Sequence, residues 1–392
     1  MGVLSRTPAP IDADRPAAAD LLRVLAAWAV GAFHIWQQSW YSGAAPAHWL
    51  RAGSVGVDWL VLLSAFCLFL PWANAAAQGR PLPLTRPAAF YRRRAVRLLP
   101  AYYASLLFSL VLALHRAGWS RTLGIDLAAH LTLTQQLFPQ SYLATRLNGV
   151  TWTLTVFALL YLVFPLLAPL CVKHPLPTLG ALCAVQLGYT LWALPQYGSD
   201  AYSSLFNQFP AFCGVLAVGL AAALVFARLA RGGWTQRLLP RAGCTVLGAL
   251  ALVWLNAQLR TQAYAAEFQR YQLVNRMPLA LAAAAMLVGF GLGLTPPRPV
   301  RRVLSWLAAL SYSFYLWHQM LAVFLKYDLH LPVWSGDTPP NQLGDTVWMK
   351  QAEALYWLAA LAVSIAAYYL IEKPAARHFK KTPQKMHAEK AR

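Results

Sequence analysis

Acidic residues are scarce in this chain. Its 392 residues include 13 Asp and Glu against 33 Lys and Arg, and charged residues make up only 12%. Hydrophobic residues make up 58%, and the mean hydropathy is +0.44. This composition excludes an ordinary soluble domain. Because apolar segments long enough to cross a bilayer recur almost throughout, the sequence predicts one polytopic membrane protein.

Cysteine is also sparse, with five residues and no CxxC pair. All five lie in or beside apolar segments, and they do not form a Cys and His cluster with the spacing of a metal site. We therefore predict neither disulfides nor a bound metal, and interpret the cysteines as small core residues. They are Cys67, Cys171, Cys183, Cys213 and Cys244.

The apolar segments predict an all-α bundle of about ten transmembrane helices. A further segment, 122–138, mixes polar and apolar residues and is expected to lie at the membrane interface or over the bundle. The expected spans are 21–40, 55–74, 99–114, 150–172, 177–195, 207–227, 242–258, 277–294, 303–325 and 353–371.

The distribution of basic residues predicts the orientation. If the N-terminus is cytoplasmic, most of the Lys and Arg residues fall in cytoplasmic segments, as the positive-inside rule requires for an even number of spans. Both termini are then cytoplasmic. We expect the protein to lie in the inner (cytoplasmic) membrane of the cell. The net charge of +20 is explained by this topology, so no nucleic-acid partner is expected. Arg276 is assigned to an outer loop in this scheme.

The ends of the chain are expected to be short tails. Residues 1–18 lack the apolar core of a cleavable signal, so we expect the first helix to remain in the mature protein. Residues 19–372 form the predicted transmembrane domain, and residues 373–392 a basic cytoplasmic tail. No fused extracytoplasmic domain is expected.

The first predicted helix carries two ionisable side chains in its apolar sequence, Arg23 and His34. They are eleven residues apart, which is about three turns and about 16 Å of rise, so they share one face of the helix. Arg23 is either an anchor at the lipid headgroups or a binding residue. His34 is either a polar contact between helices or a functional group, and ionisable groups inside a membrane are usually functional.

Asp58 stands just inside the second predicted span. Because the first two spans are joined by a short loop, this carboxylate is expected near His34, where it would fix the imidazole tautomer or favour its charged form. Alternatively, Asp58 caps the start of its own helix or binds a loop N–H group.

A basic cluster, FYRRRAVRLLPAYY, occupies residues 90–103. Arg94 and Arg97 are three residues apart and would share a face of any helix formed there. Arginine binds phosphate through two parallel hydrogen bonds, so a cytoplasmic cluster of this kind suits a phosphorylated cofactor. Basic residues after a span are also the usual topology signal.

The ninth predicted span contains SYSFYLWHQML at residues 311–321. Its polar groups, among them Tyr315 and His318, need partners inside the bundle. His318 would bind an acceptor hydroxyl or hold a helix contact. Glu372, at the cytoplasmic end of the last span, is expected to pair with Arg94 or Arg97.

Together these motifs resemble the acyltransferase-3 family of integral membrane acyltransferases over nearly the whole chain. The resemblance is carried by their order and membrane placement. The motifs are DLLR at 20–23 with His34, GVD at 56–58 followed by LLSAF, the Arg94 and Arg97 pair, WTLTV at 152–156, SYSFYLWHQ at 311–319, and EKP at 372–374.

The resemblance implies transfer of an acyl group, commonly acetyl from acetyl-CoA, to a hydroxyl of a carbohydrate, lipid-linked glycan or related acceptor. His34 matches the family's essential histidine. Arg23, Arg94 and Arg97 match arginines assigned to the acyl donor, and Asp58 and His318 match motif positions. No metal cofactor is implied.

Two residues depart from the family pattern. Phe157 stands where the family has a glutamate after WTLTV, and Ala65 replaces a glycine. Because of the departure at Phe157, one alternative is that the protein is a non-catalytic assembly subunit. A transporter or flippase is the other alternative, in which Arg, His and Asp would line a substrate path.

Overall fold

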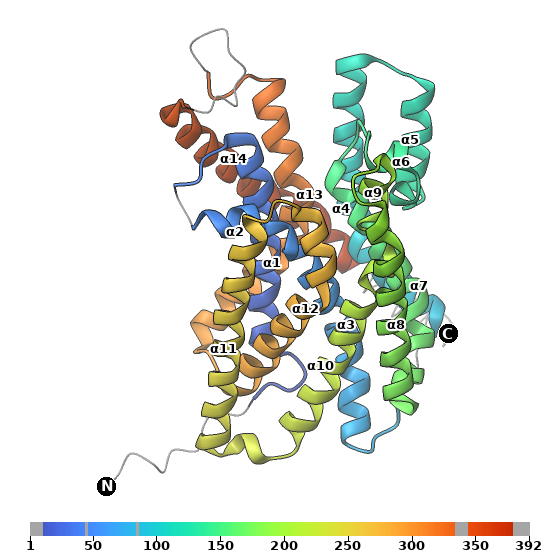
Figure 1. Ribbon diagram of the computed structural model, residues 1–392, viewed down its shortest axis with the longest axis vertical. Coiled ribbons are helices and arrows are strands. Elements are labelled where there is room, and N and C mark those ends of the chain that lie inside the picture. Colours follow the sequence, from blue (N-terminus) through green and yellow to red (C-terminus); the bar gives the residue numbers. More distant parts are fainter. Residues whose placement is uncertain (1–10, 44–45, 84–85, 334–343, 379–392) are drawn as a thin grey trace, which may run out of the picture. The chain divides into compact units, whose positions relative to one another are not determined.

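The computed structural model describes residues 11–43, 46–83, 86–333 and 344–378, and no strand occurs in these segments. The predicted all-α class is therefore confirmed. The helices are α1 (Ala17–Ser39), α2 (Ala47–Arg51), α3 (Gly56–Ala77), α4 (Pro87–Ala117), α5 (Arg121–Leu131), α6 (Pro139–Tyr142), α7 (Trp152–Lys173), α8 (Pro175–Ala193), α9 (Asp200–Leu205), α10 (Cys213–Arg231), α11 (Leu238–Ala263), α12 (Phe268–Gly293), α13 (Arg298–Tyr327) and α14 (Thr346–Ala367) (Figure 1).

The long helices coincide with the ten expected spans. Among the described residues, nine helical segments are long and apolar enough to cross a membrane, which confirms a polytopic helical bundle. The tenth expected span corresponds to α13, a helix of 30 residues. Its mean hydropathy is lower because polar residues such as Ser313, His318 and Gln319 interrupt the apolar sequence.

Several helices begin before their expected spans, and the differences at α4 and α12 change the environment of arginines. α4 starts at Pro87, a favourable first residue for a helix, so Arg94 and Arg97 lie within the same helix. α12 starts at Phe268, so Arg276 lies within the helix. The assignment of Arg276 to an outer loop is wrong, because its guanidinium is satisfied inside the protein.

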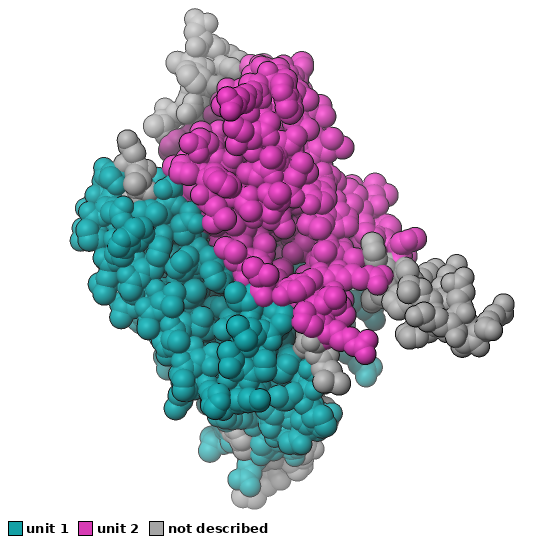
Figure 2. Space-filling model, turned by 90° about the vertical axis from the view of Figure 1, so that its right-hand side faces the viewer, with its two compact units in different colours: residues 1–30, 45–84, 163–308 teal, residues 31–44, 85–162, 309–392 magenta. Residues whose placement is uncertain are grey.

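The chain divides into two compact units, coloured separately in Figure 2. Unit 1 comprises residues 1–30, 45–84 and 163–308, and unit 2 comprises residues 31–44, 85–162 and 309–392. Three helices, α1, α7 and α13, contribute residues to both units.

Unit 1 is built from closely packed helices with small residues at their contacts. α10 packs along α3, and α11 packs along α12 (Figure 1). A Cβ added at Gly219 of α10 would lie 2.5 Å from the carbonyl oxygen of Leu62, and one at Gly289 of α12 would lie 2.6 Å from that of Cys244. Glycine thus lets the helix backbones approach, as is typical of membrane bundles.

Unit 2 has a core of side chains from α4, α7, α13 and α14. Tyr102, Leu154 and Leu316 are buried there, and Phe157 packs against them. The expected interfacial segment forms α5, which is too short to cross a bilayer. α5 packs on α4 through buried residues that include Leu123.

The contact of Gly56 with α1 provides a test of this packing. A Cβ at Gly56 would lie 2.3 Å from the carbonyl oxygen of Ala26, a backbone atom that no rotamer change can move. Gly56→Ala is therefore expected to destabilise the protein by about 1–3 kcal/mol, the usual cost of overpacking. Thermal unfolding of the detergent-solubilised protein measures this loss.

Gly180→Ala is the matched control, because nothing lies within 4 Å of a Cβ at this position in α8. Alanine favours a helix over glycine, so the control is expected to keep or gain stability. Equal unfolding temperatures for the two variants would contradict the close contact between α1 and α3.

Candidate active site

His34 lies in the last turns of α1, in the part that belongs to unit 2. Its side chain is partly exposed, and its Nδ1 lies 3.0 Å from Oε1 of Gln37, one turn further along the helix. Because an amide oxygen only accepts hydrogen bonds, Nδ1 carries the hydrogen. The lone pair of His34 is therefore on Nε2, which is the nitrogen available to act as a base.

His318 of α13 lies beside His34, with 5.3 Å between the ring centroids. The approach depends on Gly31, where a Cβ would lie 2.3 Å from the ring of Phe314. His318 is fully buried, and its Nδ1 donates to the carbonyl oxygen of Phe314 over 3.0 Å. The structure thus places side by side two histidines that belong to separate sequence motifs.

Tyr315 forms one wall of this histidine pair, with its ring centroid 5.8 Å from that of His318. Its hydroxyl donates to the carbonyl oxygen of Val150 and accepts a hydrogen bond from Thr153. These contacts tie α13 to the start of α7. Tyr315 therefore has a structural role in positioning His318.

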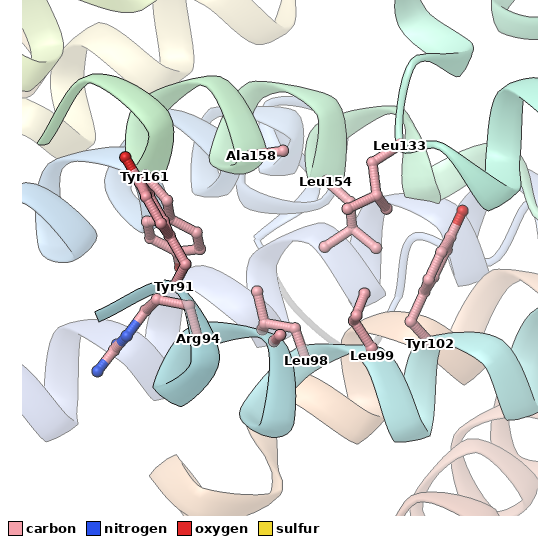
Figure 3. A pocket seen from close by; sticks show the side chains of 10 residues that line it. Tyr91, Arg94, Leu98, Leu99, Tyr102, Leu133, Leu154, Ala158 and Tyr161 are labelled. Carbon is pink, nitrogen blue, oxygen red and sulfur yellow. The ribbon is translucent and has the colours of Figure 1, made fainter. Parts of the chain in front are cut away.

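A cleft of about 150 Å³ in unit 2 lies between α4 and α7 and is partly open to the outside. Figure 3 shows Tyr91, Arg94 and Tyr161 at one end of the cleft and Tyr102 at the other. Leucine side chains form most of the wall between them. The cleft is therefore apolar, with a partly exposed arginine near one end.

Phe157 packs beside this cleft, and its ring stacks on Tyr161 with 6.3 Å between centroids. Residue 157, where the family pattern has a glutamate, therefore makes an apolar contact in the core of unit 2. A carboxylate at residue 157 would lack the aromatic stacking that holds Tyr161 at the cleft.

Arg97 has a different environment from Arg94 although the two share a helix. It is exposed and interacts electrostatically with Glu372, which also accepts a hydrogen bond from Ser313. The expected pairing of Glu372 with Arg94 or Arg97 stays a prediction. Arg94, in contrast, lines the cleft.

Arg23 lies in the part of α1 that belongs to unit 1. It is 3.6 Å from the carboxylate of Asp20 and donates to Sγ of Cys67 over 3.5 Å. Asp20 is buried and also binds Arg15 and Ser305. Arg23 keeps partial exposure, so its charge remains accessible along α1.

Asp58, also in unit 1, forms a buried ion pair with Arg276. Its Oδ1 lies 2.9 Å from Nε of Arg276, and the side chains are 1% and 0% exposed. Arg276 also stacks on the ring of Phe212 and donates to Asn207. Asp58 thus contributes to the packing of α3 and α12. The tautomer of His34 is fixed by Gln37. A catalytic role for Asp58 stays a prediction.

Within the described segments no group of three or more His, Cys, Asp or Glu side chains is close enough to hold a metal ion.

The fold and these residues define a polytopic membrane protein with a pair of neighbouring histidines in a helix bundle. A family model described as "Acyltransferase domain" matches residues 17–373, and the chain belongs to this acyltransferase-3 family. A curated relative, acyltransferase MdmB from Streptomyces mycarofaciens, is 30% identical over 181 residues, which is 44% of each chain. No solved structure matches.

The Asp58–Arg276 pair generates a prediction about stability. Asp58→Asn leaves a buried guanidinium without its counter-ion, and breaking a buried pair in this way costs about 3–5 kcal/mol. We expect a marked fall in the thermal unfolding temperature of the purified protein. The double variant Asp58→Leu with Arg276→Met removes both charges and is expected to recover much of the loss.

Glu267→Gln is the control, because Glu267 pairs with Arg270 at an exposed position and such pairs contribute little. If Asp58→Asn unfolds like the wild type while acyl transfer is lost, Asp58 has a catalytic rather than a structural role.

Proposed function

We propose that this protein transfers an acyl group, acetyl from acetyl-CoA, to a hydroxyl of a carbohydrate, lipid-linked glycan or related acceptor. The observation that carries the proposal is the fixed tautomer of His34, which leaves Nε2 as a base within the matched acyltransferase domain. The similarity to acyltransferase MdmB supports the same class of reaction.

His34 acts as a general base in this mechanism. Its Nε2 takes the proton of the acceptor hydroxyl while the hydroxyl oxygen attacks the thioester carbonyl. The carbon–sulfur bond then breaks, and the departing CoA sulfur receives the proton from His34. Gln37 supports the step because its Oε1 accepts from Nδ1–H and so stabilises the imidazolium that forms.

The donor is proposed to bind through arginine. The Arg94 guanidinium, partly exposed at the cleft, is suited to bind a phosphate of CoA through two hydrogen bonds. The apolar wall of leucines suits the less polar part of the donor. Arg97 and Arg23 are proposed to add positive charge that attracts the anionic donor from the cytoplasmic side.

The location follows from the distribution of charge. We place the protein in the cytoplasmic membrane with both termini inside, where acetyl-CoA is made available. A transporter would move a substrate without consuming acetyl-CoA, so release of the CoA thiol separates the two functions.

The histidine base is tested with His34→Ala. Loss of a general base typically lowers turnover by about 10²- to 10⁴-fold, so acceptor-dependent release of CoA thiol from acetyl-CoA should fall by this factor. The control is His115→Ala, because His115 is exposed in the last turn of α4. Acylation at the wild-type rate by well-folded His34→Ala protein would refute the mechanism.

The donor site is tested with Arg94→Ala. Loss of a charge-assisted hydrogen bond to phosphate should raise KM for acetyl-CoA by about ten- to a hundredfold with a smaller change in kcat. Arg93→Ala is the matched control, since Arg93 is exposed and does not line the cleft. Equal KM values for the two variants would place the donor phosphates elsewhere.

A further inference from the structure

The two imidazoles of the histidine pair each have one nitrogen occupied and one available. Nδ1 of His34 donates to Gln37, and Nδ1 of His318 donates to the carbonyl oxygen of Phe314. Both acceptors are oxygens that carry no hydrogen, so both Nδ1 atoms are protonated in the neutral rings. Both Nε2 atoms therefore present lone pairs.

His318 Nε2 is buried and has no hydrogen-bond partner among the described residues. A hydroxyl-bearing ring beside it belongs to Tyr315, but its hydrogen is already donated to Val150. The ring of Phe314 also stacks on His318, with 5.5 Å between centroids, and offers no donor. Several buried polar atoms of the described residues have no hydrogen-bond partner, and this nitrogen is the one that belongs to the histidine pair. Because a buried acceptor without a partner is costly, it is suited to receive a donor from a ligand.

This pattern of hydrogen bonding restricts which chemical groups a ligand can present to the two histidines. Two lone pairs in adjacent rings cannot bond to each other, and each requires a hydrogen from outside. A metal ion would also bind lone pairs, but the described residues contain no cluster with a third His, Cys, Asp or Glu ligand at this place. A small molecule with two neighbouring hydroxyl groups supplies both hydrogens at once.

We infer that His34 and His318 together recognise a vicinal diol in the acceptor, with His318 as a second acceptor-binding residue. This inference rests on the proposed function. One hydroxyl transfers its proton to Nε2 of His34 as its oxygen attacks the thioester. The neighbouring hydroxyl donates a hydrogen bond to Nε2 of His318 and keeps its proton, so it orients the acceptor without reacting.

Two small alcohols test the inference on the purified full-length protein. The probes are cis-cyclohexane-1,2-diol and cyclohexanol, which differ by one hydroxyl. Binding is measured from the shift in thermal unfolding, followed by the fluorescence of the chain's 16 tryptophans. The wild type should bind the diol about ten- to a hundredfold more tightly than cyclohexanol, the effect of satisfying one buried acceptor.

Two variants of His318 provide matched controls. His318→Asn keeps an N–H group near Phe314 but loses the acceptor at the ε position, so the two alcohols should bind equally. His318→Gln places an amide oxygen near the ε position and should retain part of the preference. A wild type without preference, or a His318→Asn protein with the full preference, would overturn the inference.

Acyl transfer to the same alcohols separates this inference from the proposed function. CoA release with either alcohol and no preference for the diol supports the acyltransferase and overturns diol recognition. Selective binding of the diol without CoA release supports diol recognition and overturns the proposed acyl transfer from acetyl-CoA. Stabilisation of the wild type by Zn²⁺, lost in His318→Asn and accompanied by no diol preference, would show a metal site instead.

Discussion

The close contact between α1 and α13 at Gly31 is the constraint on which the site in unit 2 depends. The ring of Phe314 occupies the space that a side chain at residue 31 would fill, and this brings His318 to 5.3 Å from His34. In each histidine Nδ1 binds an oxygen of the histidine's own helix, so each ring by itself has only Nε2 left for a ligand. Their juxtaposition creates two neighbouring lone pairs in a largely apolar bundle.

The cost of polar groups in a membrane explains much of the remaining arrangement. Asp58 and Arg276 satisfy each other inside unit 1, and Glu372 is bound by Ser313 in unit 2. These groups have partners and so contribute to stability and position. His318 differs from them because its Nε2 has neither a hydrogen-bond partner nor an ion-pair partner among the described residues and because it lies beside His34. This environment is the basis for assigning it a ligand.

Helix positions were predictable because hydropathy and span length directly reflect the thickness of a bilayer. The environments of single polar residues were less predictable. The helical pattern of α12 extends beyond its apolar part, so Arg276 was assigned to a loop, and its pairing with Asp58 was missed. Gln37 was missed as the partner of His34 because no motif marks it; the i, i+3 spacing on a helix was the available signal.

His34 is proposed to be the base for acyl transfer to a hydroxyl-bearing molecule. This role is tested by comparing, by mass, the glycans, lipids and small molecules of cells with the wild-type protein, with His34→Ala and with no protein. We expect an acetyl-sized mass increment on a hydroxyl-bearing molecule only in cells with the wild-type protein. An identical set of acylated molecules in all three would contradict it.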